Sequence, residues 1–237
     1  MVTTTASHIV RVSACDLRAI DRSWAFADRN AEAIDFHWDM RQAENPNFFD
    51  GRIRLLADYA VENDILRGVF LETGFKEFLY WREHGEPDAG VMDSFGSGLI
   101  RSSDGAIVLG RQRPGNINTG VAYLPGGFID PHDVGVDGSI DIAASTAREV
   151  FEETGLDPQS LTQEPGFLLT FHGNQLSIAV QYASPLPATH LREKIVAHLN
   201  SDPNSELADV VMVRGKSCIQ GLALAPYARV LLEQILS

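Results

Sequence analysis

The segment Arg148–Leu156, with the sequence REVFEETGL, constrains this chain more than any other stretch. On a helix, Glu149, Glu152 and Glu153 stand at positions i, i+3 and i+4, so they share one face. Carboxylates that lie this close repel one another, and the face needs positive charge. Arg148, four residues before Glu152, supplies part of it. A divalent cation that prefers oxygen ligands, Mg²⁺ or Mn²⁺, would supply the rest.

The residues around these glutamates suit a helix that packs on a sheet. Ala143, Ala147 and Val150 form an apolar stripe, and Gly155 suits the left-handed residue that ends a helix. Glutamates at this spacing alone are also compatible with a solvated acidic helix face. The string as a whole, Arg-Glu-apolar-x-Glu-Glu-x-Gly-apolar, fixes too many identities to arise readily by chance. We therefore favour a metal-binding helix.

Composition narrows the partners that such a site could serve. The chain has 32 acidic against 19 basic residues and a net charge of −13, which disfavours nucleic acid and anionic membranes as partners. No apolar run approaches the roughly 18 residues of a membrane span, and the first residues lack the pattern of a signal peptide. Cys15 and Cys218 form no paired motif. The expected location is the cytoplasm.

Periodicity predicts a mixture of helices and strands. Helices are expected at 24–43, 75–84, 141–154, 188–199 and 226–235. Strands are expected at 9–13, 52–60, 65–72, 93–101, 105–112, 119–124, 166–172, 176–183 and 208–213, with a polar loop at 126–140. This order predicts an α+β fold in which helices cover both faces of a mixed sheet.

A turn-rich stretch at 85–90, Gly-Glu-Pro-Asp-Ala-Gly, is the expected linker. It divides the chain into an N-terminal accessory segment, 1–90, built from a helix and a β-hairpin, and a larger domain, 91–237. The larger part carries the glutamate helix and is long enough to bury its own core.

The string at 148–156, with Pro-Gly-Gly at 125–127 upstream of it, resembles the Nudix hydrolase family, whose box reads G-x5-E-x7-R-E-U-x-E-E-x-G-U. The resemblance implies a Nudix-type α/β/α sandwich over 91–237 with a small α/β segment before it. It also implies divalent-metal-dependent hydrolysis of a pyrophosphate bond. The substrate would be a nucleoside diphosphate linked to another moiety.

The chain departs from the family pattern between the glycines and the box helix. The gap from Gly127 to Arg148 is longer than in a compact box, and Ile140 stands where the family has its first glutamate. Other acids lie nearby, at Asp130, Asp133, Asp137 and Asp141. The departure leaves the metal-binding helix intact. It is also the support for an alternative, a Nudix-fold ligand-binding or regulatory protein that does not hydrolyse its ligand.

The resemblance assigns the metal ligands to the glutamate face. Glu149, Glu152 and Glu153 would hold Mg²⁺ or Mn²⁺, and the backbone at Gly127 could add a carbonyl ligand. Arg148 would hold the glutamates in place by salt bridges. Glu149 could instead act as the general base.

In some members of the family the base is a glutamate far downstream, before a later strand. Glu206 fits that place, and Glu164 fits it less well; an ordinary exposed acid is the alternative for Glu206. Arg111 and Arg113, near the end of a predicted strand, could contact phosphates, with a solvated surface pair as the alternative.

The sequence does not decide which moiety is linked to the nucleoside diphosphate. The stretches at 47–55, 68–73 and 78–82 are loosely similar in layout to the front segment of Nudix enzymes that cleave UDP-sugars, whereas Leu-Pro-Gly-Gly-Phe-Ile-Asp at 124–130 resembles the coenzyme A diphosphatase branch. An NDP-sugar, ADP-ribose, a dinucleotide or a coenzyme A type substrate are therefore all compatible. Front segments of this kind often cover the substrate pocket or build a dimer interface, so a homodimer is a further expectation.

Overall fold

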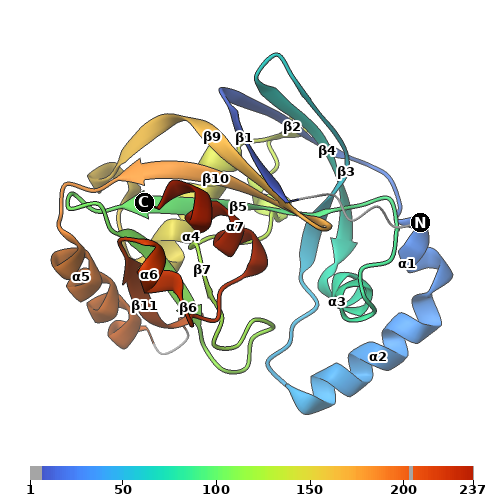
Figure 1. The fold of residues 1–237 in the computed structure, drawn as a ribbon. Helices are drawn as coiled ribbons and strands as arrows, with labels where there is room; N and C mark the ends of the chain where they lie inside the picture. Colours follow the sequence, from blue (N-terminus) through green and yellow to red (C-terminus); the bar gives the residue numbers. More distant parts are fainter. Residues whose placement is uncertain (1–6, 203–204, 237) are drawn as a thin grey trace.

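The computed structural model describes residues 7–202 and 205–236, and two sheets organise them (Figure 1). The larger sheet has seven strands in the order β1-β9-β10-β5-β6-β11, and β7 pairs with β6. Its strands are β1 (His8–Val12), β5 (Asp93–Arg101), β6 (Ile107–Gln112), β7 (Ala122–Tyr123), β9 (Thr162–His172), β10 (Gln175–Ala183) and β11 (Leu207–Val213). The sheet is mixed, as predicted, because β5 and β10 run parallel while the other neighbours run antiparallel.

The smaller sheet has four strands in the order β3-β4-β2-β8. They are β2 (Ala14–Ile20), β3 (Arg52–Glu62), β4 (Ile65–Gly74) and β8 (Ser139–Ile140). The predicted hairpin is present, and Asn63 and Asp64 form its turn with φ of 51° and 64°. This is the left-handed region, which Asn and Asp tolerate better than most residues.

Strand pairing ties the front segment to the rest of the chain. β1 adds to the edge of the large sheet beside β9, and β8 adds to the edge of the small sheet beside β2. β2 was missed by the sequence prediction. The division at residue 90 into an accessory segment and a hydrolase domain stays a prediction.

Helices cover both faces of the large sheet. Neighbouring side chains of a strand point to opposite faces, and on β5 the ring of Phe95 contacts Tyr227 of α7 (Pro226–Ile235), at 4.9 Å between centroids. The next residue, Gly96, faces Thr146 of α4 (Ile142–Thr154). α4 and α7 therefore lie on opposite sides of β5. α5 (Ala188–Ser201) packs beside β11 and α4, which completes the α/β/α layers.

Two glycines on β5 allow α4 to lie unusually close to the sheet. A Cβ added at Gly96 would lie 2.4 Å from Thr146 Oγ1, and one added at Gly98 would lie 2.4 Å from Val150 Cγ2. Gly96 and Gly98 face the same side of the strand, and Thr146 and Val150 are one helical turn apart. The helix that carries the glutamates is thus seated directly on the strand backbone.

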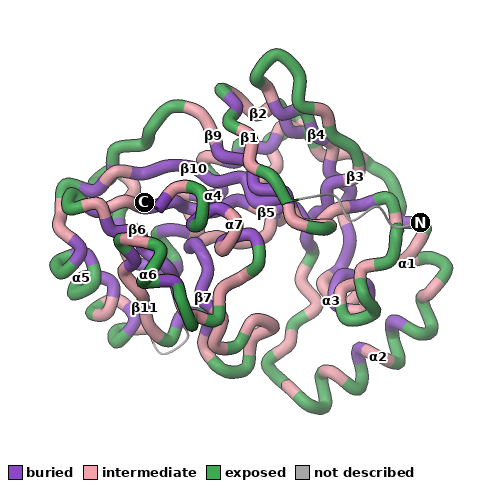
Figure 2. The backbone as a smooth tube through the Cα atoms, viewed as in Figure 1, coloured by how far each residue is buried: buried purple, intermediate pink, exposed green. Residues whose placement is uncertain are grey.

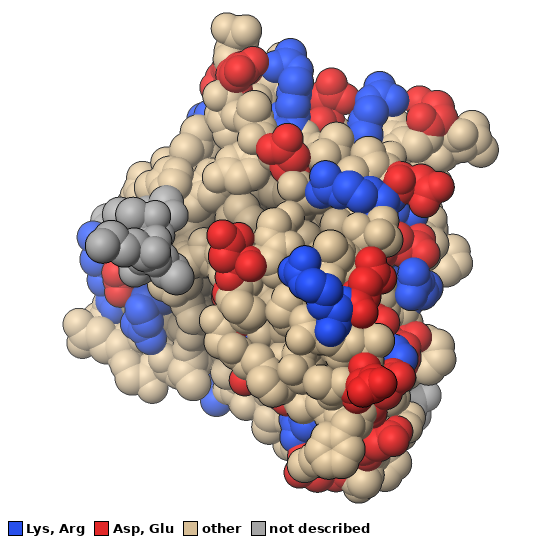
Figure 3. Space-filling view, turned by 90° about the vertical axis from the view of Figure 1, so that its right-hand side faces the viewer, with Lys and Arg blue, Asp and Glu red and all other residues tan. Residues whose placement is uncertain are grey.

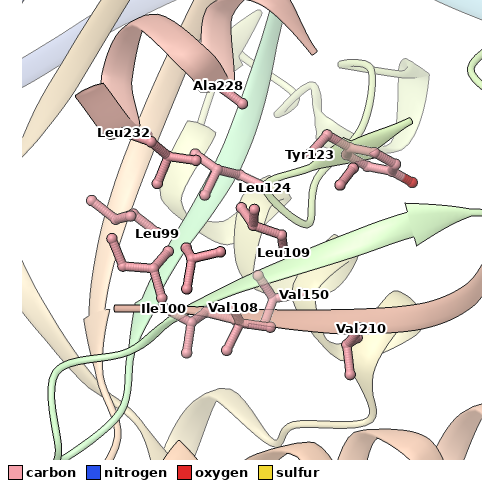
Figure 4. Packing of buried hydrophobic residues seen from close by; sticks show 14 of the residues in the cluster. Leu99, Ile100, Val108, Leu109, Tyr123, Leu124, Val150, Val210, Ala228 and Leu232 are labelled. Atoms are coloured by element: carbon pink, nitrogen blue, oxygen red, sulfur yellow. The ribbon is translucent and has the colours of Figure 1, made fainter. Parts of the chain in front are cut away.

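Buried apolar residues form one large cluster on the main sheet and two smaller ones. The large cluster joins strands β5, β6 and β10 to the helices on both faces, and Figure 4 shows part of it, including Leu99, Val108, Val150 and Leu232. A second cluster lies between the two sheets. The third holds Trp24 and Trp81 where α3 (Phe75–Glu83) packs on the small sheet. Figure 2 shows the central strands buried and much of α2 (Ala31–Glu44) exposed.

The predicted helix at 24–43 is wrong in one respect, because it divides into α1 (Ala25–Arg29) and α2. Asn30 lies at the break, and its side-chain Nδ2 donates to the carbonyl of Phe26 at 2.7 Å. Asparagine side chains compete with backbone hydrogen bonds in this way. The predicted strand at 119–124 is also shorter, since the structure keeps only β7 of it, and α6 (Lys216–Ile219) was not predicted.

Acidic and basic side chains are interspersed on the face that Figure 3 shows, over the side of the molecule where α1, α2 and α3 lie. Ion pairs join α2 to α3, including Lys76 with Asp35 at 2.6 Å and Arg41 with Glu83 at 3.1 Å. Among the described residues, no helix combines the length and apolar character that a membrane crossing requires.

We expect Gly98→Ala to lower the free energy of unfolding by about 1–3 kcal/mol, because the new methyl group meets the stiff side chain of Val150. Urea unfolding followed by circular dichroism measures this. Gly51→Ala is the control, since its Cβ would meet the Phe49 ring at an ordinary 3.4 Å. Adding Val150→Ala should recover part of the loss; equal losses at Gly98 and Gly51 would contradict the proposed close contact.

Candidate active site

α4 presents the predicted glutamates on its last turns and begins and ends as the sequence indicates. Asp141 caps its start by accepting hydrogen bonds from the backbone N–H groups of Ala143 and Ala144, at 3.1 and 3.0 Å. Gly155 ends it with φ of 66°, the left-handed conformation predicted for that position. The helix is therefore held at both ends by local interactions.

Arg148 pairs with carboxylates on both sides of it. Its Nη1 lies 2.8 Å from Glu149 Oε1 and 3.2 Å from Glu152 Oε2. Its Nη2 lies 3.2 Å from Asp133 Oδ1 and 3.4 Å from Asp130 Oδ2. Burial by itself would lower the pKa of Arg148, but the neighbouring Glu149 and Asp133 carboxylates outweigh it and raise that pKa. One guanidinium thus offsets the repulsion within an acidic cluster.

The long loop before α4 supplies two of these carboxylates. Its 3₁₀ turn Pro131–Asp133 begins with reciprocal capping: the N–H of His132 donates to Asp130, and the N–H of Asp130 donates to Asp133 at 3.0 Å. The Asp133 side chain is 4% exposed, so its contact with Arg148 is sheltered from water. The sequence places these acids near the box but does not predict their contact with Arg148, because the loop has no periodic pattern.

Ile140 occupies a structural position rather than a site position. It lies in β8, pairs with Leu17 of β2 and is 5% exposed. An isoleucine is suited to this buried strand, whereas an unpaired glutamate would be costly there. Asp130 and Asp133 therefore supply acidic partners for Arg148 that do not come from position 140.

Glu153 points into the protein and is 5% exposed. Its Oε1 accepts a hydrogen bond from the Tyr123 hydroxyl at 2.6 Å, and its Oε2 accepts one from the Gly126 N–H at 2.8 Å. Burial raises the pKa of Glu153 to about 8, although both hydrogen bonds oppose the rise. Figure 4 shows the Tyr123 hydroxyl at the edge of the apolar cluster.

Glu149 lies against the Pro-Gly-Gly segment. A Cβ at Gly127 would lie 2.6 Å from Glu149 Oε2, so a side chain there would displace the carboxylate. A Cβ at Gly126 would lie 2.2 Å from the carbonyl oxygen of Gly96, and Gly126 has φ of 155°. Burial raises the pKa of Glu149 to about 7, with Arg148 acting against it. The glycines therefore bring backbone and carboxylate together.

The donor chemistry of this region fits Mg²⁺ or Mn²⁺, since it consists of carboxylate and carbonyl oxygens. In residues 7–202 and 205–236, however, no three acidic, His or Cys side chains are gathered as a cation site. Instead, Arg148 contacts both Glu149 and Glu152, and Glu153 accepts hydrogen bonds from Tyr123 and Gly126. The proposed ligands Glu149, Glu152 and Glu153 share one helical turn, but in the described residues their carboxylates do not converge on one point.

A cavity of about 300 Å³ opens beside Gly126 and Gly127, within the range of small-molecule sites. Glu206 lines it, as do Tyr123 and residues of β5, β10 and α7. Glu206 is exposed, yet partial desolvation of its carboxyl group and the nearby charge of Glu152 raise its pKa. The structure thus places Glu206 near the glutamate helix, and its chemical role stays a prediction.

The arginines predicted to contact phosphates do not line this cavity in the described structure. Among the described residues that line it, neither Arg111 nor Arg113 occurs, whereas Gln112 does. Arg111 and Gln112 are neighbours on β6 and point to opposite faces, and Arg113 follows the end of the strand. The Arg113 guanidinium reaches the Leu207 carbonyl at 3.4 Å. Arg82 of α3 lines the cavity instead and donates to Asn118 Oδ1 at 2.6 Å. Only tertiary packing reveals this contribution of the front segment.

Asp93 is a second cavity residue that sequence reasoning missed. It begins β5, is 5% exposed and accepts a hydrogen bond from Gln175 Nε2 at 3.0 Å. Burial raises its pKa to about 6, while the Gln175 hydrogen bond and the charge of Arg82 limit the rise. An aspartate at the start of a strand whose next seven residues are small or apolar is the sequence signal that could have marked it.

Comparison with known proteins agrees with this site. A model of the NUDIX domain matches residues 94–207, the region that holds the glycines, the glutamate helix and Glu206. A comparison with curated protein sequences found no significant match. Residues 94–207 therefore form a NUDIX domain, the domain of the Nudix hydrolase family.

Solved structures with a similar fold have low sequence identity. RenU, a Nudix hydrolase from M. smegmatis, is 20% identical over 61% of this chain and 83% of its own, with a TM-score of 0.42. A MutT protein from Methanosarcina mazei Go1 is 22% identical over 60% of this chain and 91% of its own, with a TM-score of 0.40. A bifunctional NMN adenylyltransferase/ADP-ribose pyrophosphatase from Francisella tularensis is 14% identical over 67% of this chain and 44% of its own, with a TM-score of 0.42. Likenesses this weak identify no substrate.

Tyr123→Phe should lower the free energy of unfolding by about 1–2 kcal/mol, because Glu153 Oε1 loses its donor while staying buried. Chemical unfolding at pH 7 measures the loss. Tyr182→Phe is the matched control: Tyr182 is also buried, and its hydroxyl has no hydrogen-bond partner within the described part of the chain. Similar losses for the two variants would show that the Tyr123 hydroxyl does not support Glu153.

Asp93 should make stability depend on pH. Its pKa is raised from 3.8 to about 6, so the folded state binds a proton more tightly than the unfolded state does. The resulting stabilisation, at most about 3 kcal/mol, is present below pH 3.8 and is lost as the pH rises through 6. Asp93→Asn should remove this component. Unfolding curves of both proteins between pH 4 and 7 test it, and parallel pH profiles would contradict it.

Proposed function

We propose that this Nudix hydrolase cleaves a pyrophosphate bond in a nucleoside diphosphate linked to another moiety, with Mg²⁺ or Mn²⁺ as cofactor. One observation carries the proposal. One helical turn carries Glu149, Glu152 and Glu153, and two of them meet glycines that line a cavity. Glu149 lies against Gly127, and Glu153 accepts a hydrogen bond from Gly126. Nudix hydrolases generally need a divalent metal, and these oxygen donors suit one.

Glu149, Glu152 and Glu153 are the proposed metal ligands, with the Gly127 carbonyl as a further candidate. When bound, the cation masks phosphate charge and lowers the pKa of water. To bind the cation, Glu149 and Glu152 would have to release Arg148. Asp130 and Asp133 support this exchange, because they keep Arg148 paired from the other side.

Two glutamates are candidates for the general base. Both Glu149 and Glu206 have a raised pKa, and for Glu149 it is about 7, where a carboxylate can accept a proton near neutral pH. Glu206 is the better candidate in one respect, because it lines the cavity and is not paired with Arg148 in the described residues. Glu149 would then act as a metal ligand and not as the base.

Arg82 joins Arg111 and Arg113 as a candidate for binding the charged parts of the substrate. It is the member of this group that lines the cavity. We therefore assign it the phosphate or leaving-group contact in preference to the two strand arginines. An NDP-sugar, ADP-ribose, a dinucleotide and a coenzyme A type substrate all remain candidates.

The alternative is a Nudix-fold protein that binds its ligand without hydrolysis. The pairing of Arg148 with Glu149 and Glu152 is compatible with it, since no metal site is assembled in the described residues. The retention of Glu149, Glu152 and Glu153 favours hydrolysis, because a simple binder needs none of them. Cytoplasmic location, a possible homodimer and the absence of nucleic acid or membrane partners are further parts of this proposal.

Glu152→Gln should lower kcat by about 100-fold or more, because the cation loses an anionic ligand. The assay is release of monophosphate, with Mg²⁺, from UDP-glucose, ADP-ribose, NADH, coenzyme A, dinucleoside polyphosphates and dNTPs. EDTA should abolish activity and Mn²⁺ should restore it.

Glu193→Gln is the matched control for charge, since Glu193 is exposed on α5 outside the cavity lining. Full activity of Glu152→Gln would contradict the metal assignment. A wild-type protein that binds nucleotides but releases no monophosphate from any of these substrates would favour the non-hydrolytic alternative.

A further inference from the structure

One oxygen of Asp93 has a bonding capacity that the protein does not use. Its Oδ2 accepts the hydrogen bond from Gln175, but its Oδ1 is buried without a hydrogen-bond partner in residues 7–202 and 205–236. Buried carboxylate oxygens are rarely left so, because removing them from water without a donor is costly. Asp93 also lines the cavity. A donor on a bound molecule could therefore satisfy this oxygen.

A structural ion pair does not explain Asp93. Arg82 is the nearby positive charge and lines the same cavity, but its guanidinium donates to Asn118, and no described ion pair joins it to Asp93. Because the pKa of Asp93 rises only to about 6, the carboxylate stays ionised at neutral pH, and Oδ1 is then an acceptor. The missing partner must be an N–H or O–H group.

The cavity wall around Asp93 suits a flat ring. Phe95, two residues further along β5, lines the cavity on the same side of the strand, and its ring contacts that of Tyr227. Phe128 adds a third aromatic ring. Aromatic side chains pack well against the faces of heterocycles. A nucleobase has both features, namely a flat ring and an edge with an N–H group.

The same cavity reaches Gly126, Gly127 and Glu206 at the glutamate helix. A substrate with its diphosphate at that helix would extend its nucleoside along the cavity toward β5. We propose that Asp93 reads the nucleobase of the substrate by accepting one of its N–H groups at Oδ1, while Gln175 fixes the orientation of the carboxylate. This assignment rests on the proposed function for the diphosphate, but base recognition itself needs no hydrolysis.

The test uses nucleoside monophosphates, which have no pyrophosphate bond to cleave. Calorimetry with Mg²⁺ measures binding of UMP, CMP, AMP and GMP to the wild-type protein, to Asp93→Asn and to Asp16→Asn, an exposed control. The wild type and the control should prefer one base. Asp93→Asn should weaken binding of that nucleotide about tenfold or more, because a hydrogen bond to a charged acceptor is lost. Binding of inorganic pyrophosphate should change less than about twofold.

A second measurement does not depend on any variant. Methylation of the N–H group on the preferred base should weaken its binding to the wild type by a similar factor, whereas removal of the ribose 2′-hydroxyl should not. Three results would overturn the inference. The first is an unchanged base preference in Asp93→Asn, and the second is an equal loss of affinity for all four nucleotides and for pyrophosphate. The third is a loss of affinity on removal of the ribose 2′-hydroxyl instead of on methylation of the base. If the wild type reads bases but hydrolyses nothing, the base contact stands and the proposed reaction fails.

Discussion

The close contact between α4 and β5 determines where every other part of the site lies. Because Gly96 and Gly98 have no side chains, Thr146 and Val150 of the helix reach the strand backbone. The same approach leaves the Pro-Gly-Gly segment a narrow space beside Gly96, in which Gly126 donates to Glu153. A wider separation between helix and sheet would remove this bond and move Glu149 away from Gly127.

The sequence predicted what depends on local patterns. The glutamate face, the end of α4 at Gly155 and the hairpin turn at Asn63 follow from helical spacing and from residues that tolerate left-handed backbone. β2 was missed, although its sequence alternates, with exposed Asp16 and Arg18 on either side of buried Leu17. So short an alternation does not identify a strand by itself, and the partner β4 is distant in sequence.

Contacts between distant segments could not be predicted in this way. Arg148 meets Asp133 because a non-periodic loop folds back over the helix, and Arg82 reaches the cavity because α3 packs beside it. The choice between Arg82 and Arg111 depends on which side of β6 faces the cavity. A single strand without a known neighbour does not reveal its inner side.

The edge positions of β1 and β8 affect how the chain can fold as it is synthesised. β1, from residues 8–12, pairs with β9, so this strand waits for a partner more than a hundred residues later, whereas β2 pairs with the nearer strand β4 before β8 is made. Contacts of such long sequence separation slow folding. The large sheet cannot complete its β1 edge until β9 has left the ribosome, so β1 stays unpaired while the residues between the two strands are made. An unpaired strand is a site where chains can associate wrongly, and the pairing of β1 with β9 removes that site.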